Sequence, residues 1–278
     1  AAFIPEDEII DRMNALRLLA HNHPHSDAAA QATQDRAAAL RTLLADRHRN
    51  AREVARAVYD GLAYLPRGSE GDAMVRGLVT RLVRLDLLSE AAELLEHQVF
   101  KRLRGAERST VAADLAPLYL DDRRPSEALR VLRSTRVAGI DAQVLDRRRF
   151  LEATALERTG APDAALELLQ SASSASIELR AEIEWRSHRW ADAAATYAAI
   201  LGEATAPLNE RQRNALLRAG AAYVLAGDEA SFADLRAESV KRFGGFPEQE
   251  LLGFMSLDGS EAGAGFMEAY RRLYAAEG

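Results

Sequence analysis

The chain has 278 residues, of which 48% are apolar and 28% charged, and its formal net charge is −6. An acidic chain is not suited to coating nucleic acid or an anionic membrane surface, and no apolar run approaches the ~20 residues that span a bilayer. The absence of cysteine excludes disulfides, thiolate metal sites and cysteine nucleophiles. It also slightly favours the periplasm over the cytoplasm, because a stray thiol is a liability in an oxidising compartment.

Residues 1–68 are predicted to form N-terminal helices. The sequence begins without Met or a leader, so we expect a processed or trimmed product. An apolar stripe at helical spacing predicts a capping helix, and it consists of Ile9, Met13, Leu16 and Leu19. Pro5 and the acidic residues after it suit the start of that helix. A degenerate repeat is possible from about Gln34 to Tyr64.

The run HNHPHSD, residues 21–27, contains three of the six histidines. His21, His23 and His25, with Asp27, are ligand types that zinc, copper or nickel accept. Because Pro24 breaks the helix, the run reads first as a turn in which Ser26 or Asp27 caps the following helix. The histidines are therefore weak metal candidates, and a metal-responsive role remains an alternative.

Residues 69–244 contain segments that repeat one another. RRPSEALRVL (residues 123–132) and GAPDAALELL (residues 160–169) superpose at a separation of 37, which aligns Pro125 with Pro162 and Ala128 with Ala165. DLLSEAAELL lies 37 residues before the first of these, and HRWADAAATY follows the last by 28. Each segment predicts a turn followed by the second helix of a pair.

The first helix of each pair shows its own pattern of apolar residues at i, i+3, i+4 and i+7, which is one helical face. In each set the third member is small or slim and the fourth is large. The sets are Val75, Leu78, Val79 and Leu82; Ala112, Leu115, Ala116 and Tyr119; and Leu216, Ala219, Gly220 and Tyr223.

These patterns resemble the tetratricopeptide-repeat family, whose unit is a helix pair of about 34 residues. Tyr119 and Tyr223 match the first-helix aromatic of that family, and Trp190, Ala193 and Tyr197 match its turn and second helix. The resemblance implies an all-α fold, an antiparallel helix-pair solenoid of about four to five pairs with capping helices at both ends. Residues 245–278, with an apolar stripe at Phe266, Met267, Tyr270 and Leu273, are expected to form the C-terminal capping helices.

The sequence also departs from the family pattern. The spacings of 37, 37, 28 and about 39 residues are irregular, Glu184 stands where an aromatic is expected, and Phe232 stands where an alanine is expected. Pro117 lies inside a predicted first helix and should kink that helix or delay its start.

No catalytic motif is present: the chain lacks a phosphate-binding GxxxxGK[ST], an HExxH and a GxSxG. Asp121-Asp122 could serve acid–base chemistry, but a solvated turn is the simpler interpretation. The run Arg147-Arg148-Arg149 could bind phosphate, but the acidic residues around it favour a salt-bridged helix face. We therefore expect a non-enzymatic protein that needs no cofactor.

The resemblance implies a concave groove lined by the first helices, which holds a peptide or a partner helix. By the superposition above, the candidate partner-binding residues are Arg76, Arg84, Arg147, Phe150, Arg158, Trp185, Arg186 and Arg218. Arginine and buried aromatic residues are typical interface hot spots. The alternative for Phe150 and Trp185 is that they pack between helices as core. The family's carboxylate-clamp residues are absent, so a chaperone-tail receptor is not expected.

The function expected from the sequence is a protein-interaction scaffold that binds a partner protein or peptide, without nucleic acid and without a membrane span. Two alternatives remain open at this point. One is a structural component that self-associates end to end, and the other is a regulator that responds to a metal or small ligand at residues 21–27.

Overall fold

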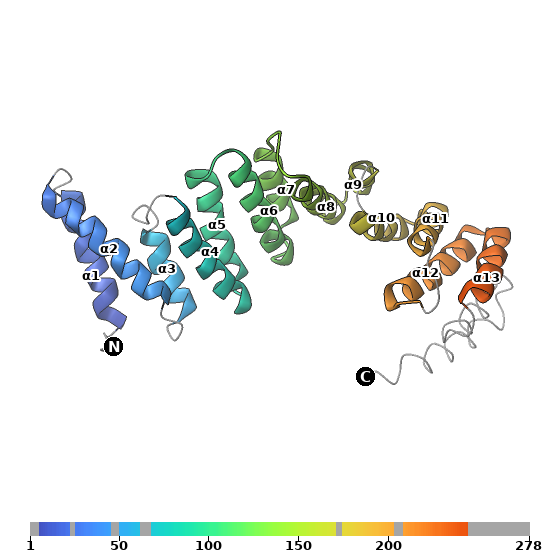
Figure 1. Ribbon diagram of the computed structural model, residues 1–278, viewed down its shortest axis with the longest axis horizontal. Helices are drawn as coiled ribbons and strands as arrows, with labels where there is room; N and C mark the ends of the chain where they lie inside the picture. The colour runs from blue at the N-terminus through green and yellow to red at the C-terminus, as the bar shows by residue number, and fades with distance from the viewer. Residues whose placement is uncertain are drawn as a thin grey trace. The chain divides into compact units, whose positions relative to one another are not determined.

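The structure, a computed structural model, describes residues 6–22, 26–45, 50–61, 68–170, 174–202 and 208–243 (Figure 1). These residues are helical with short connections and contain no strand, which confirms the predicted all-α class for this part of the chain. They divide into two compact units, Ala1–Leu151 and Glu152–Gly278, and the division falls inside helix α8. The expected C-terminal capping helices at 245–278 lie outside the described residues.

The α-helices are, in chain order, α1 (Glu6–Asn22), α2 (Asp27–Ala45), α3 (Ala51–Gly61), α4 (Ser69–Arg84), α5 (Leu88–His97), α6 (Gly105–Asp121), α7 (Pro125–Ser134), α8 (Ala142–Arg158), α9 (Pro162–Leu169), α10 (Ser174–Arg186), α11 (Trp190–Leu201), α12 (Glu210–Ala226) and α13 (Glu229–Phe243). A short π-helix, η2 (Gln98–Arg102), continues directly from α5.

Five turns of the same geometry join α4 to α5, α6 to α7, α8 to α9, α10 to α11 and α12 to α13. Each contains one residue with a left-handed backbone, and these residues are Asp86, Arg123, Gly160, His188 and Gly227. In every turn the next residue donates its backbone N–H to the carbonyl five residues earlier, at 2.7 to 3.0 Å. This is the Schellman arrangement, which satisfies carbonyls at the end of the first helix. The left-handed residues keep the irregular spacing that the sequence predicts.

The same turns fix where each second helix begins. The helix starts two residues after the left-handed residue in all five cases, and Pro125 and Pro162 occupy that first position, where a missing N–H costs no helical hydrogen bond. Three residues further on, the side chain is buried: the position holds Ala91, Ala128, Ala165, Ala193 and Phe232. The alignment of Ala128 with Ala165 is therefore confirmed, and so is the substitution of phenylalanine in the last pair.

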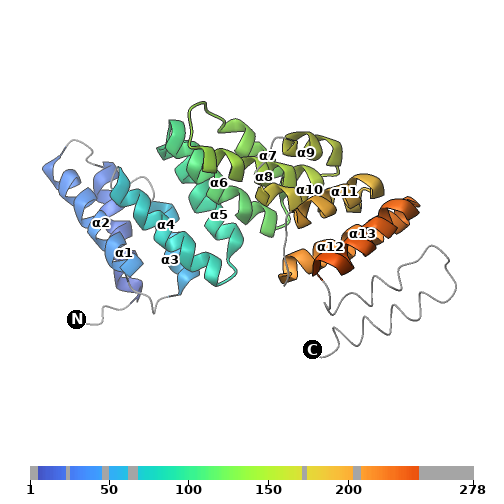
Figure 2. The same cartoon turned by 45° about the vertical axis from the view of Figure 1, so that its right-hand side comes forward.

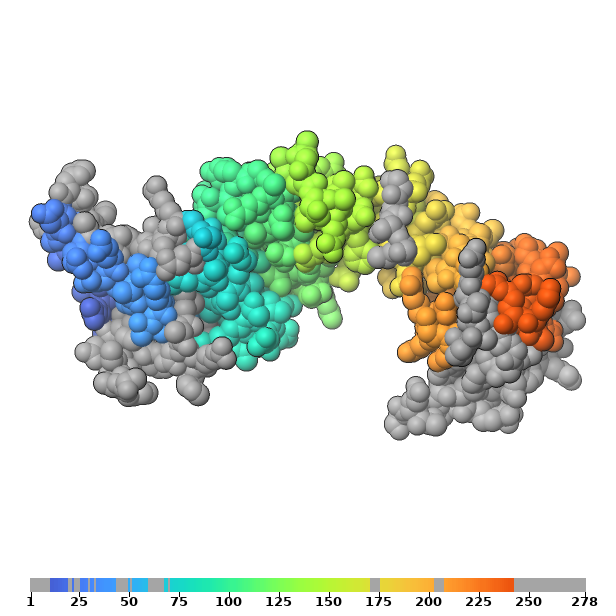
Figure 3. Space-filling view, in the orientation of Figure 1, coloured from blue at the N-terminus to red at the C-terminus, as the bar shows by residue number. Residues whose placement is uncertain are grey.

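In unit Ala1–Leu151, successive helices pack on one another. α2 packs on α1, α3 and α4, and α5 packs on α3, α4 and α6, while α6 also packs on α7. Figures 1 and 2 show α4, α5 and α6 side by side in this order, and α4 and α5 form part of the visible surface in Figure 3. The first-helix residues Leu82, Leu115 and Tyr119 are almost completely buried, as the sequence pattern predicts.

In unit Glu152–Gly278, α10 packs on α9 and α11, and α12 packs on α11 and α13. Its core contains Ala181, Ala193, Tyr197, Leu216 and Ala219, with Trp185 packed against it. The small residues let the helices approach closely, and the aromatic residues fill the space that remains.

Two local predictions have a clear outcome. Helix α6 runs from Gly105 through Pro117, so the idea that this proline delays the start of the helix is wrong. The proline lies within a helix that is buried on both sides of it, at Ala116 and Leu118, and this packing offsets the lost hydrogen bond. The Ser26 hydroxyl accepts a hydrogen bond from the Ala29 N–H at 3.1 Å, which confirms the predicted N-cap of α2.

The recurring turn generates a stability prediction. A left-handed backbone costs a residue with a side chain ~1–2 kcal/mol, whereas glycine adopts it freely. Arg123→Gly should therefore stabilise the chain by ~0.5–1 kcal/mol, after allowing for the larger entropy of glycine in the unfolded chain. Gly160→Ala, at the equivalent turn, should destabilise it by ~1 kcal/mol, because a Cβ there meets no atom within 4 Å and only backbone strain remains.

Urea denaturation followed by circular dichroism would measure both changes. A lower unfolding midpoint for Arg123→Gly would contradict the assignment of this turn.

Candidate functional site

The structure places the sequence-predicted site residues on four helices. Arg76 and Arg84 lie on α4, Arg147, Phe150 and Arg158 on α8, Trp185 and Arg186 on α10, and Arg218 on α12. Arg76 and Trp185 are half-buried and the others are exposed. Phe150 is 36% exposed, so it is a surface side chain and not core. Trp185 is both a core and a surface residue: part of its side chain packs against the core of its unit, and the rest reaches the surface.

An aromatic cluster surrounds Trp185 in unit Glu152–Gly278. Its ring lies 5.2 Å from the ring of Trp190 and 6.2 Å from that of Tyr197, edge to face in both cases. The guanidinium of Arg218 lies 4.8 Å from the centre of the Trp185 ring, which is a cation–π contact. Helices α10, α11 and α12 therefore each contribute to a single cluster.

Glu182 connects this cluster to two arginines. Its carboxylate accepts hydrogen bonds from the Tyr197 hydroxyl at 3.0 Å and from Arg186 Nε at 3.2 Å, and the Arg218 guanidinium lies 3.8 Å away. Burial and then the charge of Glu182 raise the pKa of Tyr197 above its ordinary value. The cluster is thus fixed by charge as well as by packing.

Within each unit, ion pairs link successive first helices. Arg186 of α10 also bonds Glu157 of α8 at 3.0 Å, and Arg211 of α12 pairs with Glu178 of α10. In unit Ala1–Leu151, Arg147 of α8 bonds Asp114 of α6 at 2.7 Å. The acidic partner lies on the earlier helix in every case. Sequence reasoning missed Glu157, although it lies beside the predicted Arg158.

Arg76 and Arg84 differ from the other predicted arginines. Within the part of the chain that the structure describes, their guanidinium groups make no ion pair or hydrogen bond. Asp72, the acidic residue four positions before Arg76, is buried and bonds Arg102 at 2.8 Å.

The arginine run on α8 is a salt-bridged surface at two of its three positions. Arg147 pairs with Asp114, and Arg149 lies 3.6 Å from Asp146. Arg148 does not lie at the surface: it is 5% exposed and donates to the carbonyls of Ser109 and Leu132. It satisfies backbone groups inside the fold and so cannot contact a phosphate.

A second polar cluster, in unit Ala1–Leu151, joins helices α5, α6 and α7. Glu96 accepts hydrogen bonds from the Tyr119 hydroxyl at 2.9 Å and from Arg130, and Arg124 lies over the Tyr119 ring. Although burial opposes the shift, hydrogen bonding to Arg130 lowers the pKa of Glu96 below its ordinary value. The buried Tyr119 ring is therefore held at its hydroxyl end by a partly exposed charge network.

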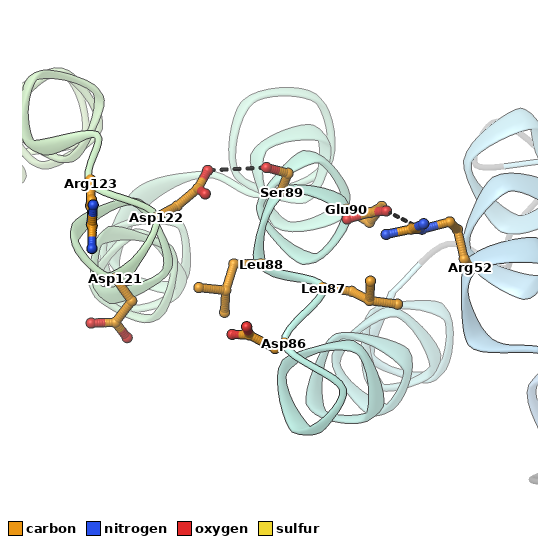
Figure 4. Close-up of a pocket in the computed structure, with 9 residues that line it drawn as sticks. All are labelled: Arg52, Asp86, Leu87, Leu88, Ser89, Glu90, Asp121, Asp122 and Arg123. Carbon is orange, nitrogen blue, oxygen red and sulfur yellow. Dashed lines mark hydrogen bonds and ion pairs between the residues drawn. The ribbon is translucent and has the colours of Figure 1, made fainter.

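A polar pocket of about 390 Å³ lies where the α4–α5 and α6–α7 turns approach one another (Figure 4). Ser89 donates a hydrogen bond to Asp122 at 3.0 Å across it, and Arg52 bonds Glu90 at 2.7 Å at its other side. Arg124 lies 3.6 Å from Asp122, while Asp121 is exposed. This environment agrees with a solvated turn at Asp121-Asp122, because Ser89 and Arg124 engage the Asp122 carboxylate and Asp121 is exposed.

Among the described residues, no group of three or more histidine, aspartate or glutamate side chains could hold a metal ion. His23 and His25 lie outside those residues, as does the side chain of His21, so the run at 21–27 stays a sequence-based alternative. No helix in the described ranges is long and apolar enough to cross a membrane.

The tyrosine in the Trp185 cluster generates a pH prediction. Because its pKa is raised in the folded chain, Tyr197 stays protonated above about pH 10, where the same phenol ionises in the unfolded chain. The folded state then holds a proton that the unfolded state has lost, so the free energy of unfolding falls as the pH rises from 9 to 11.

Tyr197→Phe should remove part of this fall, and the exposed Tyr59→Phe is the matched control. Urea midpoints at pH 9 and pH 11 would measure it. An unchanged pH dependence in Tyr197→Phe would refute the role assigned to this hydroxyl.

Comparison with known proteins adds no relative: no family model matches the sequence, and no curated protein matches it.

Proposed function

We propose that this chain is a non-enzymatic scaffold that binds a partner protein or peptide through the exposed face of its first helices. In this proposal the helix pairs form a tetratricopeptide-like antiparallel solenoid. Two observations support that architecture: the identical turns that join five pairs, and the packing of helices on their neighbours in sequence within each unit.

The observation that carries the proposal is the Trp185 cluster. An aromatic ring that is partly accessible, fixed by Tyr197 and covered by Arg218, is pre-organised for contact with a partner. Tryptophan and arginine are the residue types that most often dominate binding energy at protein interfaces. Because the ion pairs with Glu157 and Glu182 already hold the arginines in place, little side-chain entropy remains to be lost on binding.

Other exposed residues on the first helices of unit Glu152–Gly278 fit the same role. Arg158 lies on α8, and Asn214 lies on α12 one turn before Arg218. Each belongs to a first helix, so a partner that follows these helices meets alternating charged, amide and aromatic groups. Such a surface offers hydrogen bonds at its edge and apolar contact at its centre, as protein interfaces do.

Affinity capture from the source cell's lysate tests this proposal. Wild type should retain a partner that Arg186→Ala/Arg218→Ala loses or holds at least ten-fold more weakly, since the loss of two hot-spot arginines costs ~2 kcal/mol or more. The matched control is Arg12→Ala/Arg236→Ala, which removes the same charge from the exposed surfaces of α1 and α13.

Circular dichroism should show that both variants remain folded. Equal capture by wild type and Arg186→Ala/Arg218→Ala would exclude the Trp185 cluster as the binding site. If no variant retains a partner and light scattering shows concentration-dependent oligomers, a self-associating structural component would replace the scaffold.

A further inference from the structure

Helix α4 has an exposed basic face that takes part in none of the contacts described above. Ala73, Gly77, Thr80 and Arg84 follow one another at helical spacing and are all exposed, and Arg76 borders them. We call these five residues the α4 face. From Ala73 to Arg84 the helix carries three arginines and no acidic residue, in a chain whose net charge is −6.

Gly77 has no structural reason to be glycine in this position. Its backbone is helical, and a Cβ added to it would meet no atom within 4 Å. A glycine inside an exposed helix nevertheless weakens that helix relative to alanine, because it has more freedom to lose on folding. The absence of a side chain at Gly77 leaves the backbone of α4 open to close approach from outside the helix.

The two arginines of the α4 face differ from the other candidate arginines of the first helices. The guanidinium groups of Arg76 and Arg84 have no acidic partner among the described residues, whereas Arg147, Arg186 and Arg218 all do. A glycine that weakens the free helix and two arginines that have no acidic partner among the described residues therefore lie together on one exposed surface, a combination that suits a binding site.

We propose that the α4 face binds an acidic peptide segment of the partner protein, with the segment's backbone crossing α4 at Gly77 and its carboxylates reaching Arg76 and Arg84. This inference rests on the proposed scaffold function and adds the chemistry of the partner to it. Arginine suits the role because its planar guanidinium can hold a carboxylate by two hydrogen bonds.

The geometry also limits the spacing of the acidic residues. Arg76 and Arg84 are eight positions apart, which corresponds to ~12 Å along a helix. An extended peptide covers that distance in about four residues. The segment should thus carry acidic side chains about four positions apart, close enough for both arginines to be engaged at once.

A peptide fits this face better than a nucleic acid. The exposed residues of α6, which packs on α5 as α4 does, include Glu107 and Asp121. A polyphosphate that extended beyond α4 would carry a charge at every nucleotide and be repelled by these carboxylates, whereas a natural peptide segment can place uncharged residues there.

Fluorescence polarisation with the full chain and a fluorescein-labelled decaglutamate probe tests the inference at low and at physiological salt. Wild type should bind the probe, more weakly as salt rises. Arg76→Ala/Arg84→Ala should weaken binding about ten-fold, since each exposed ion pair contributes modestly. The control Arg12→Ala/Arg236→Ala should change it less than two-fold.

A second variant separates close approach from charge. Gly77→Leu keeps every arginine and favours the helix, so it should raise the unfolding temperature while weakening probe binding at least five-fold. An affinity unchanged in Gly77→Leu would overturn the crossing at Gly77. An affinity unchanged in Arg76→Ala/Arg84→Ala would overturn the α4 face as an acidic-peptide site, and the scaffold function would still be judged by lysate capture.

The same assay with a fluorescein-labelled ten-residue oligothymidine identifies the class of ligand. Weaker binding than decaglutamate supports the peptide. Equal or tighter binding that Arg76→Ala/Arg84→Ala abolishes would replace the peptide with single-stranded nucleic acid.

Discussion

The Schellman turn within each helix pair determines where the other side chains lie. The left-handed residue allows the last carbonyls of the first helix to be hydrogen-bonded, and the second helix begins two residues after it. The buried position of the second helix therefore always falls at the same distance from the left-handed residue. An alanine there, such as Ala91 or Ala165, lets the two helices come close. One face of the first helix is then buried against the second helix. The opposite face of the first helix carries the charged and aromatic groups.

This dependence explains how much of the fold the sequence could predict. The turn residues, the prolines at helix starts and the buried alanines each have a local cause, so their positions follow from spacing alone. Pro117 shows the limit of local reasoning, because packing at Ala116 and Leu118 holds α6 together despite the proline. The π-helix at Gln98–Arg102 left no pattern that periodicity could reveal.

The candidate site was less predictable, because its contacts join residues that are far apart in sequence. Helical phase correctly put Arg147 and Arg186 at the surface but gave no sign of their partners Asp114 and Glu157. Arg148 illustrates the same point in reverse: its neighbours Arg147 and Arg149 are paired at the surface, yet it bonds buried carbonyls. A side chain of that length reaches groups that no local pattern specifies.

The uniform turns have a consequence for how such a chain can change over time. Since all five turns have the same geometry, the differences in repeat length fall on the helices themselves and on the connections between one pair and the next, such as Thr135–Asp141 between α7 and α8. A residue gained or lost within a turn would break two backbone hydrogen bonds and shift a buried alanine, whereas one gained in a connection would change neither. Insertions and deletions, including those that create new loops, are therefore expected in the connections between successive helix pairs and not in the turns within them.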